Sequence, residues 1–477
     1  MIDRRYGKKI RALRQREGLT QSVLAARLGV SASYLNLLEN DRRPLTTDLL
    51  LKLAQTFDLD LRYFSGEDDA HLVADMTELF GDAVFEDHPL TAKDVAEFVA
   101  HSPDVARAVV RLHQAYTHTR TSTEALAQRV LDSQDALDTV ERSRLSSEQV
   151  SDLLERRGNY FAELESAAEQ LWREAGLRED DLYAGLVRFI ERAYRVTVKI
   201  VPAQSSGGAV RRYDPTRREL LLSEVLHDGS RNFQLATQIG LFHCRAAIDG
   251  ILHDPLVTSE ESRALGRVVL AGYFAGAVLM PYATFLRTAE DVRYDIELLG
   301  QRFRTGFEQT CHRLTTLRRP GMEGVNFYLV RVDMAGNISK KFSAAGIRFP
   351  RFSGLCPLWN VHAAFLQPGV VRVQISKQLD GTTVLAIART VRRRVGAYHA
   401  PTVLYSVGIG CDLSQAHKLV YADGIDIENP ALAVPIGITC RLCERMSCQA
   451  RAFPSIHRPL RVNEDVRGVS FFAVPET

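Results

Sequence analysis

Five of the seven cysteines lie in the last third of the chain, and their spacing suits metal chemistry. Cys440, Cys443 and Cys448 fall within nine residues of one another. Thiolates gathered in this way bind an iron–sulfur cluster or a structural zinc ion, and four are enough for either group. A fourth thiolate would come from Cys411 or, in its place, from Cys356. The sequence therefore predicts a four-cysteine metal site.

The spacing favours an iron–sulfur cluster over zinc, and either metal group over free thiols, without deciding among the three. Zinc sites usually combine one CxxC pair with a second close pair, whereas a tight trio with one distant partner is more typical of a cluster. The remaining cysteines, Cys244 and Cys311, lie in apolar helical segments. We expect them to be core residues.

The first 64 residues carry a positive charge that the chain as a whole lacks. They hold twelve basic and seven acidic residues, whereas the formal net charge of the whole chain is only +2. The overall charge does not argue for nucleic acid, but a local excess on a small domain suits a polyanion.

Residues 20–36 predict two short helices joined by a tight turn at Gly29. Ala25 and Val30 are small enough to let these helices approach closely. Together with residues 37–44, the segment resembles the lambda-repressor-like (Cro/C1-type) helix-turn-helix family, whose second helix enters the DNA major groove. The alternative is a solvated helical pair that contacts another protein.

This resemblance implies DNA contacts for seven side chains. Gln21 is expected to touch a phosphate, and Arg42 and Arg43 to lie on the DNA backbone. Phosphate contacts would supply most of the affinity, while contacts to base edges would select the sequence. The residues expected to face the groove are Ser31, Ser33, Tyr34 and Asn36.

The segment 233–243 predicts an apolar helix and resembles the helix in which a class of zinc metallopeptidase-like domains carries His-Glu-x-x-His. Such a site needs two imidazoles one turn apart as ligands and a glutamate as base. Here Thr237, Gln238 and Leu241 occupy the matching positions. We therefore expect that this domain has no peptidase activity and that the protein is not an enzyme.

A domain that keeps a cleft after losing its catalytic groups is a candidate for ligand sensing, by analogy. Arg211, Arg212 and Tyr213, together with Tyr273 and Phe274, would suit an anionic ligand with an apolar tail. The alternative is that the two arginines are simply exposed to solvent and bind no ligand.

The elements that position these residues predict a multidomain chain. An all-α helix-turn-helix domain covers residues 1–66, and an α-helical connector with a linker covers 67–147. An α+β metallopeptidase-like domain without zinc ligands follows at 148–318, with a hairpin turning at residues 214–215. A strand-rich α+β domain covers 319–477.

The chain is expected to be cytoplasmic. Its first residues are charged and lack the apolar core of a secretory signal. Residues 268–286 are uncharged and long enough to span a bilayer. Because they contain glycines and Pro281, we expect a buried helix that ends near Pro281 rather than a membrane span.

Four motifs extend the resemblance along the whole chain: RGNY at 157–160, RYDP at 212–215, CPLW at 356–359 and CRLCER at 440–445. They resemble the short-chain fatty acyl-CoA-responsive transcriptional regulators, which include regulators of propionate (methylcitrate cycle) genes and of the glyoxylate enzyme isocitrate lyase. The resemblance implies double-stranded operator DNA, a short-chain acyl-CoA effector bound by the middle domain, a C-terminal [4Fe–4S] cluster and a homodimer or larger oligomer.

Two other functions remain open at this point. One is a metallopeptidase-type regulator that cleaves a partner protein, which the loss of all the zinc ligands disfavours. The other is a ligand-independent, phage-type repressor with a structural zinc, which would not need the five-cysteine domain.

Overall fold

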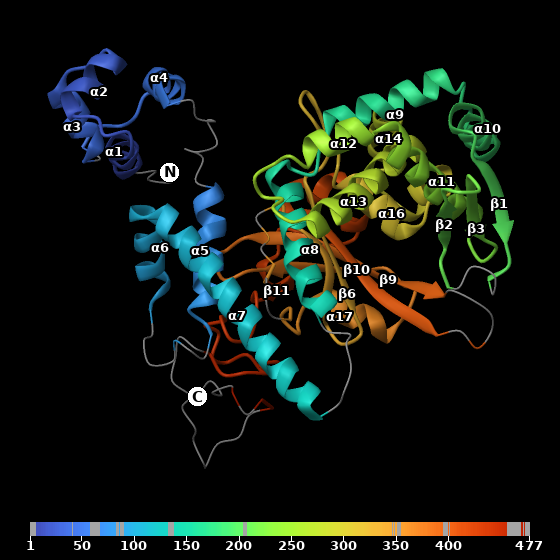
Figure 1. Ribbon diagram of the computed structural model, residues 1–477. Coiled ribbons are helices and arrows are strands. Elements are labelled where there is room, and N and C mark those ends of the chain that lie inside the picture. Colours follow the sequence, from blue (N-terminus) through green and yellow to red (C-terminus); the bar gives the residue numbers. More distant parts are fainter. Residues whose placement is uncertain are drawn as a thin grey trace. The chain divides into compact units, whose positions relative to one another are not determined.

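The computed structural model of the chain (Figure 1) forms two compact units. One consists of Met1–Ser133 with Cys440–Thr477, and the other of Gln134–Thr439. The structure describes residues 6–40, 42–57, 67–82, 85, 90–131, 138–203, 208–345, 347, 349–350, 354–394, 399, 401–455, 469–470 and 472.

The N-terminal region of the first unit is a helical helix-turn-helix bundle, which confirms the prediction. Thr20 and Ser31 cap successive helices, because each hydroxyl accepts a hydrogen bond from the backbone N–H three residues on. Gly29 ends the first of these helices with a φ of +71°, which disfavours any side chain. The predicted end of the domain at residue 66 lies outside the described residues. The helices are α1 (Gly7–Arg16), α2 (Gln21–Leu28), α3 (Ala32–Glu39) and α4 (Thr47–Phe57).

Three further helices of this unit bury a small core of their own. Thr91 and Asp94 form a capping box at the start of the second one. The helices are α5 (Glu67–Leu79), α6 (Ala92–His101) and α7 (Pro103–Leu131). Their core consists of Leu72, Met76, Leu79, Val95, Val99, Ala106 and Val110. Part of the expected linker is therefore helical, since α7 continues to Leu131.

The second unit begins with helices and a small mixed sheet, and its middle region is α+β as predicted. The sheet order is β1-β3-β2, with β1 parallel and β2 antiparallel to β3. The helices are α8 (Asp138–Arg156), α9 (Ala162–Glu174), α10 (Leu182–Tyr194), α11 (Asp228–His243), α12 (Arg245–Ile251), α13 (Glu260–Leu279), α14 (Tyr282–Asp291), α15 (Ile296–Arg302) and α16 (Phe307–Leu314). The strands are β1 (Thr197–Val201), β2 (Arg211–Asp214) and β3 (Glu219–Ser223).

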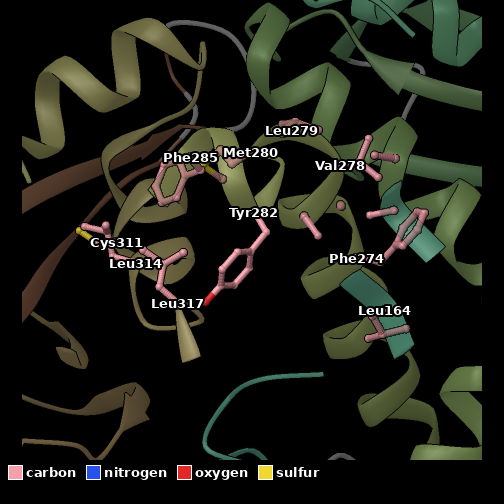
Figure 2. Packing of buried hydrophobic residues seen from close by; sticks show 14 of the residues in the cluster. Leu164, Phe274, Val278, Leu279, Met280, Tyr282, Phe285, Cys311, Leu314 and Leu317 are labelled. Carbon is pink, nitrogen blue, oxygen red and sulfur yellow. The ribbon is translucent and has the colours of Figure 1, made fainter. Parts of the chain in front are cut away.

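Helix α13 is the central helix of this region and packs against α8, α9 and α11. Among the described residues it is the one helix whose length and composition alone would allow a membrane span. Its residues Phe274 and Val278 lie among the buried side chains of the main core (Figure 2). The close approach of α11 depends on Gly240, since a Cβ there would meet the Phe274 ring. The helix ends just before Pro281, where the sequence predicts its end.

A six-stranded sheet makes the rest of the unit strand-rich, as expected. Its order is β11-β8-β9-β10-β6-β7, and all pairs are antiparallel except β11 with β8. Gly336 and Gly381 lie at two hairpin turns of this sheet with positive φ. The strands are β6 (Phe327–Asp333), β7 (Ile338–Phe342), β8 (Arg372–Lys377), β9 (Thr383–Arg394), β10 (Thr402–Asp412) and β11 (Ala433–Pro435), and β4 (Arg318–Arg319) pairs with β5 (Met322–Glu323).

The six-stranded sheet buries both faces. Residues that alternate along β10, namely Val407, Ile409 and Cys411, belong to the same core as the helices of the middle region. The other face packs against Trp359 and Val361 at the short helix α17 (Asn360–Ala363). The sheet is therefore a layer with a different hydrophobic cluster on each side.

Candidate nucleic-acid interface and sensing sites

A buried carboxylate at the end of α3 holds the helix-turn-helix together. Arg14 of α1 donates to Glu39 from Nε (2.6 Å to Oε1) and from a terminal nitrogen (3.0 Å to Oε2), and the Gln21 amide of α2 donates to Oε2 at 2.8 Å. Burial alone would raise the pKa of Glu39, but the hydrogen bonds from Arg14 and Gln21 outweigh it and keep the pKa below its ordinary value. An ionised Glu39 therefore ties α1, α2 and α3 into one arrangement.

The residues predicted to read DNA lie on the outside of this arrangement. Ser31, Ser33, Asn36, Arg42 and Arg43 are exposed. Tyr34 and Gln21 are half-buried. Three of these side chains are also engaged within the domain. The Ser31 hydroxyl caps α3, the Gln21 amide donates to Glu39, and the Asn36 amide oxygen accepts a hydrogen bond from Asn40 at 2.9 Å. Their contacts with DNA stay predictions.

The matching positions on α11 carry no zinc ligand. Thr237 is buried, and its hydroxyl donates to the carbonyl of Phe233 at 2.7 Å, a bond within the helix. Gln238 is also buried, and Leu241 is half-buried against the main core. In the described part of the chain, no three His, Cys, Asp or Glu side chains are grouped as metal ligands.

Arg211, on β2, is a half-buried cation without a carboxylate partner among the described residues. A terminal nitrogen donates to the carbonyl of Gln234 on α11 at 3.3 Å, and burial lowers the pKa of the guanidinium. Arg212 is exposed, while the Tyr213 ring packs edge-on against Phe242 with 5.1 Å between centroids. The β2 and α11 elements thus bring a cation and an aromatic pair together.

Tyr273 and Phe274, predicted to contact a ligand, have structural roles. The Tyr273 hydroxyl donates to Glu165 at 2.7 Å, and the same carboxylate pairs with Arg313 at 2.5 and 2.9 Å. Phe274 is fully buried beneath Gly240. A ligand contact by either residue stays a prediction.

Within the second unit, Cys411 and Cys356 belong to different faces of the six-stranded sheet. The Cys411 side chain is fully buried in the main core, and burial raises the pKa of its thiol to about 12. Cys356 is also buried, but in the cluster of Trp359 and Tyr328 on the opposite face. A metal-binding thiol must lose its proton. The apolar enclosure of Cys411 opposes that loss.

Cys440, Cys443 and Cys448 lie in a short irregular segment of the first unit. The backbone N–H of Ala452 donates to the Cys440 sulfur at 3.4 Å. Such donors are typical around metal-bound thiolates. Arg451, which follows the last cysteine by three residues, is buried against the backbone of this segment. The sequence analysis missed this arginine, although its place beside a cysteine trio was a signal.

Three family models match consecutive parts of the chain. Residues 10–64 match a helix-turn-helix model, and residues 191–315 match the IrrE N-terminal-like domain. Residues 316–472 match the model described as short-chain fatty acyl coenzyme A regulator, C-terminal.

Curated relatives match over almost the full length. The chain is 41% identical to the HTH-type transcriptional regulator PrpR of Mycobacterium tuberculosis, covering 96% of this chain and 93% of the relative. It is 38% identical to the regulator RamB of the same species, with 98% of each chain covered. It is also 38% identical to the propionyl-CoA carboxylase regulator of Cereibacter sphaeroides, with 97% of each covered. A solved structure of a Mycobacterium tuberculosis transcriptional regulator matches with a TM-score of 0.65 and 41% identity, covering 68% of this chain and 98% of that one.

Because named transcriptional regulators match along nearly its whole length, and its N-terminal region matches a helix-turn-helix model, the chain is a helix-turn-helix transcriptional regulator. It belongs to the short-chain fatty acyl coenzyme A regulator family. This confirms the family that the sequence motifs indicate, and the relatives confirm that the chain is a regulator rather than an enzyme.

The buried Glu39 makes the stability of the DNA-reading helices testable. Glu39→Gln leaves Arg14 without its counter-charge, and breaking a buried ion pair of this kind costs about 3 kcal/mol. We expect amide hydrogen exchange in α2 and α3 of the full chain, measured by mass spectrometry, to become at least about tenfold faster. Glu17→Gln, at an exposed position, is the control. Equal protection in E39Q and the unmodified chain would mean that Glu39 does not anchor the helices.

Proposed function

We propose that this protein binds operator DNA in the cytoplasm as a homodimer or larger oligomer and regulates genes of short-chain fatty acid metabolism, under the control of a short-chain acyl-CoA. The observation that carries this proposal is the full-length similarity to named transcriptional regulators, one of them named for propionyl-CoA carboxylase. Propionate and acetate, through methylcitrate or glyoxylate metabolism, are the proposed metabolic context.

The DNA contacts are proposed for the exposed side of α3 and the residues that follow it. Ser33 and Asn36 are exposed there, which suits contacts to base edges, and for Asn36 such a contact would compete with the hydrogen bond that its amide oxygen accepts from Asn40. Arg42 and Arg43 are exposed cations that suit the phosphate backbone. Helix-turn-helix proteins commonly read two half-sites as dimers, which supports the proposed oligomer.

The effector contact is proposed for Arg211. A half-buried guanidinium without a carboxylate has lost water without gaining a counter-charge, and an anionic ligand would supply that charge. Acyl-CoA offers phosphates for such a contact and an apolar acyl chain for aromatic side chains. Arg212, Tyr213, Tyr273 and Phe274 remain members of the proposed ligand-binding set.

The proposed cofactor is a [4Fe–4S] cluster held by Cys440, Cys443 and Cys448, with zinc as the alternative. The support is the spacing of three thiols in one short segment and the family resemblance. The described side chains do not fit a preformed site, because no three His, Cys, Asp or Glu side chains among them are arranged as metal ligands. When bound, the cluster would let the regulator report the supply of iron. The fourth thiolate is proposed to come from Cys411 or, in its place, from Cys356. Both are buried in hydrophobic clusters, so burial does not choose between them.

The DNA-binding proposal is tested on sequences selected from genomic fragments by the purified chain. Arg43→Gln should weaken binding to all sequences alike. It should also reduce the slope of the logarithm of affinity against the logarithm of salt concentration by about one. Asn36→Ala should instead reduce the free-energy preference for the selected sequence over other sequences by about 1–3 kcal/mol, because it removes a base contact. Fluorescence anisotropy measures both, with Lys93→Gln on α6 as control. Unchanged sequence preference in N36A would remove Asn36 from the reading face.

The effector proposal is tested by calorimetric titration with propionyl-CoA, acetyl-CoA and free CoA. Arg211→Gln should weaken binding by about tenfold or more, since a partly desolvated charge-assisted contact is worth about 1.5–3 kcal/mol. Arg217→Gln, at an exposed turn of the same hairpin, should leave affinity unchanged. If R211Q binds as tightly as the unmodified chain, the ligand lies elsewhere.

The cofactor proposal is tested by anaerobic purification, visible absorbance, and iron, sulfide and zinc analysis of the same sample. About four irons per chain are expected. Cys443→Ser should abolish the visible absorbance. Of Cys411→Ser and Cys356→Ser, the variant that weakens the absorbance identifies the fourth ligand, and unchanged absorbance in both would remove both from the ligand set. A colourless protein with one zinc would establish the alternative.

A further inference from the structure

Helix α7, the 29-residue helix of the first unit (Figure 1), has apolar side chains on a side that its own core does not use. Ala106 and Val110 bury the other side of the helix in the core that α7 shares with α5 and α6. By contrast, Val105 is 52% exposed and Leu112 is 70% exposed. The exposed apolar residues, here called the α7 stripe, are Val105, Ala108, Leu112, Ala115 and Tyr116.

The spacing of the α7 stripe is that of a helix packed against another helix. Single exposed apolar residues are common and need no partner. Residues 105, 108, 112 and 115, however, are separated by three, four and three positions, which is the spacing of the a and d positions of a coiled coil. With Tyr116 they form a face about 100° wide. The helix cannot turn this face inward without exposing Ala106 and Val110.

We propose that the α7 stripe packs against the α7 stripe of a second copy of this chain, as a parallel two-stranded coiled coil. This inference rests on the proposed homodimer and names its interface. In a parallel pair with twofold symmetry, each residue of the seam meets its own copy. Layers of Val105 and Leu112 then alternate with layers of Ala108 and Ala115, so large and small side chains alternate along the seam.

The borders of the stripe favour a second copy as the partner and a parallel direction. Arg111 is exposed and precedes Tyr116 by five residues, the spacing of g and e positions that face each other across a parallel coiled coil. Its guanidinium would stack on the Tyr116 ring of the second copy, a cation–π contact. That ring also lies 6.2 Å from the ring of His113 on its own helix, between centroids. In an antiparallel pair centred on the same stripe, Arg111 would instead face Arg111 of the second copy, and like charges would repel.

Pairing through α7 would set the spacing of the two DNA-reading helices. Helix α7 belongs to the same compact unit as the helix-turn-helix, and α1 packs against α6 within that unit. A parallel pair has twofold symmetry along its axis, so both helix-turn-helix bundles lie at the same end. A protein that reads two half-sites of one operator needs this arrangement.

The first test measures the dimer dissociation constant of the full chain by analytical ultracentrifugation, with Leu112→Glu as the variant. Each copy loses the burial of a leucine, a loss of about tenfold or more, so the dissociation constant should rise at least about hundredfold. Leu366→Glu is the matched control, because Leu366 is a 78% exposed leucine of the second unit. It should leave the dissociation constant unchanged. The circular dichroism of L112E should match that of the unmodified chain, since Leu112 is not part of the core of its own chain.

The second test measures the direction of the pair by disulfide crosslinking. Ala108→Cys places a thiol on the seam, where it meets its own copy in a parallel pair, and mild oxidation should yield covalent dimers. Arg107→Cys, one residue away and outside the stripe, should yield no more covalent dimer than the unmodified chain, which measures the background from the native cysteines. An antiparallel pair would place residue 108 opposite residue 112. A108C would then crosslink only when mixed with Leu112→Cys, and that result would overturn the parallel pair.

The outcomes separate this inference from the proposed function. If L112E dimerises as tightly as the unmodified chain and A108C gives no crosslink above background, the inference fails, while the proposed dimer stands with another interface. If L112E does not fold, the crosslink of A108C decides: its presence supports the α7 pair and its absence overturns it. If the unmodified chain is a monomer both in solution and on operator DNA, the inference and the proposed dimer fail together.

Discussion

The buried ion pair between Glu165 and Arg313 is the interaction on which the second unit depends. Its partners are 148 residues apart, on α9 and α16, and neither ion is stable in the core without the other. The Tyr273 hydroxyl from α13 completes the carboxylate shell, and Arg313 also donates to the carbonyl of Met280 at 2.9 Å. Three helices are thereby held at one point. The chain leaves that point through β4 and β5 to enter the six-stranded sheet.

A buried ion pair also holds the helices of the helix-turn-helix together. Glu39 is buried at the meeting of α1, α2 and α3, where Arg14 and Gln21 satisfy it. Paired buried charges therefore fix the frameworks of both units. Arg211 departs from this rule, since it has a carbonyl partner but no carboxylate among the described residues. The proposed anionic effector would supply the missing charge there.

Local signals made part of this structure predictable. The caps at Thr20 and Ser31 and the turn at Gly29 follow from the conformational preferences of single residues. The buried ion pairs do not follow from such local preferences, because the partner of Glu165 lies 148 residues further along the chain. The hydrogen bond from the Tyr273 hydroxyl to Glu165 also joins residues far apart in the sequence, so no local signal predicts it. The alternation of Val407, Ile409 and Cys411 could have indicated a shared buried face, and that signal was missed.

The division of the chain constrains how regulation can work. The cysteine segment 440–448 belongs to the same compact unit as the helix-turn-helix, whereas Arg211 belongs to the other unit. An effector at Arg211 would then act on the unit that lacks the helix-turn-helix. An effector changes DNA affinity only if it binds the DNA-competent and incompetent forms with different affinity. Thermodynamic linkage makes this coupling reciprocal, so operator DNA must change effector affinity by the same factor.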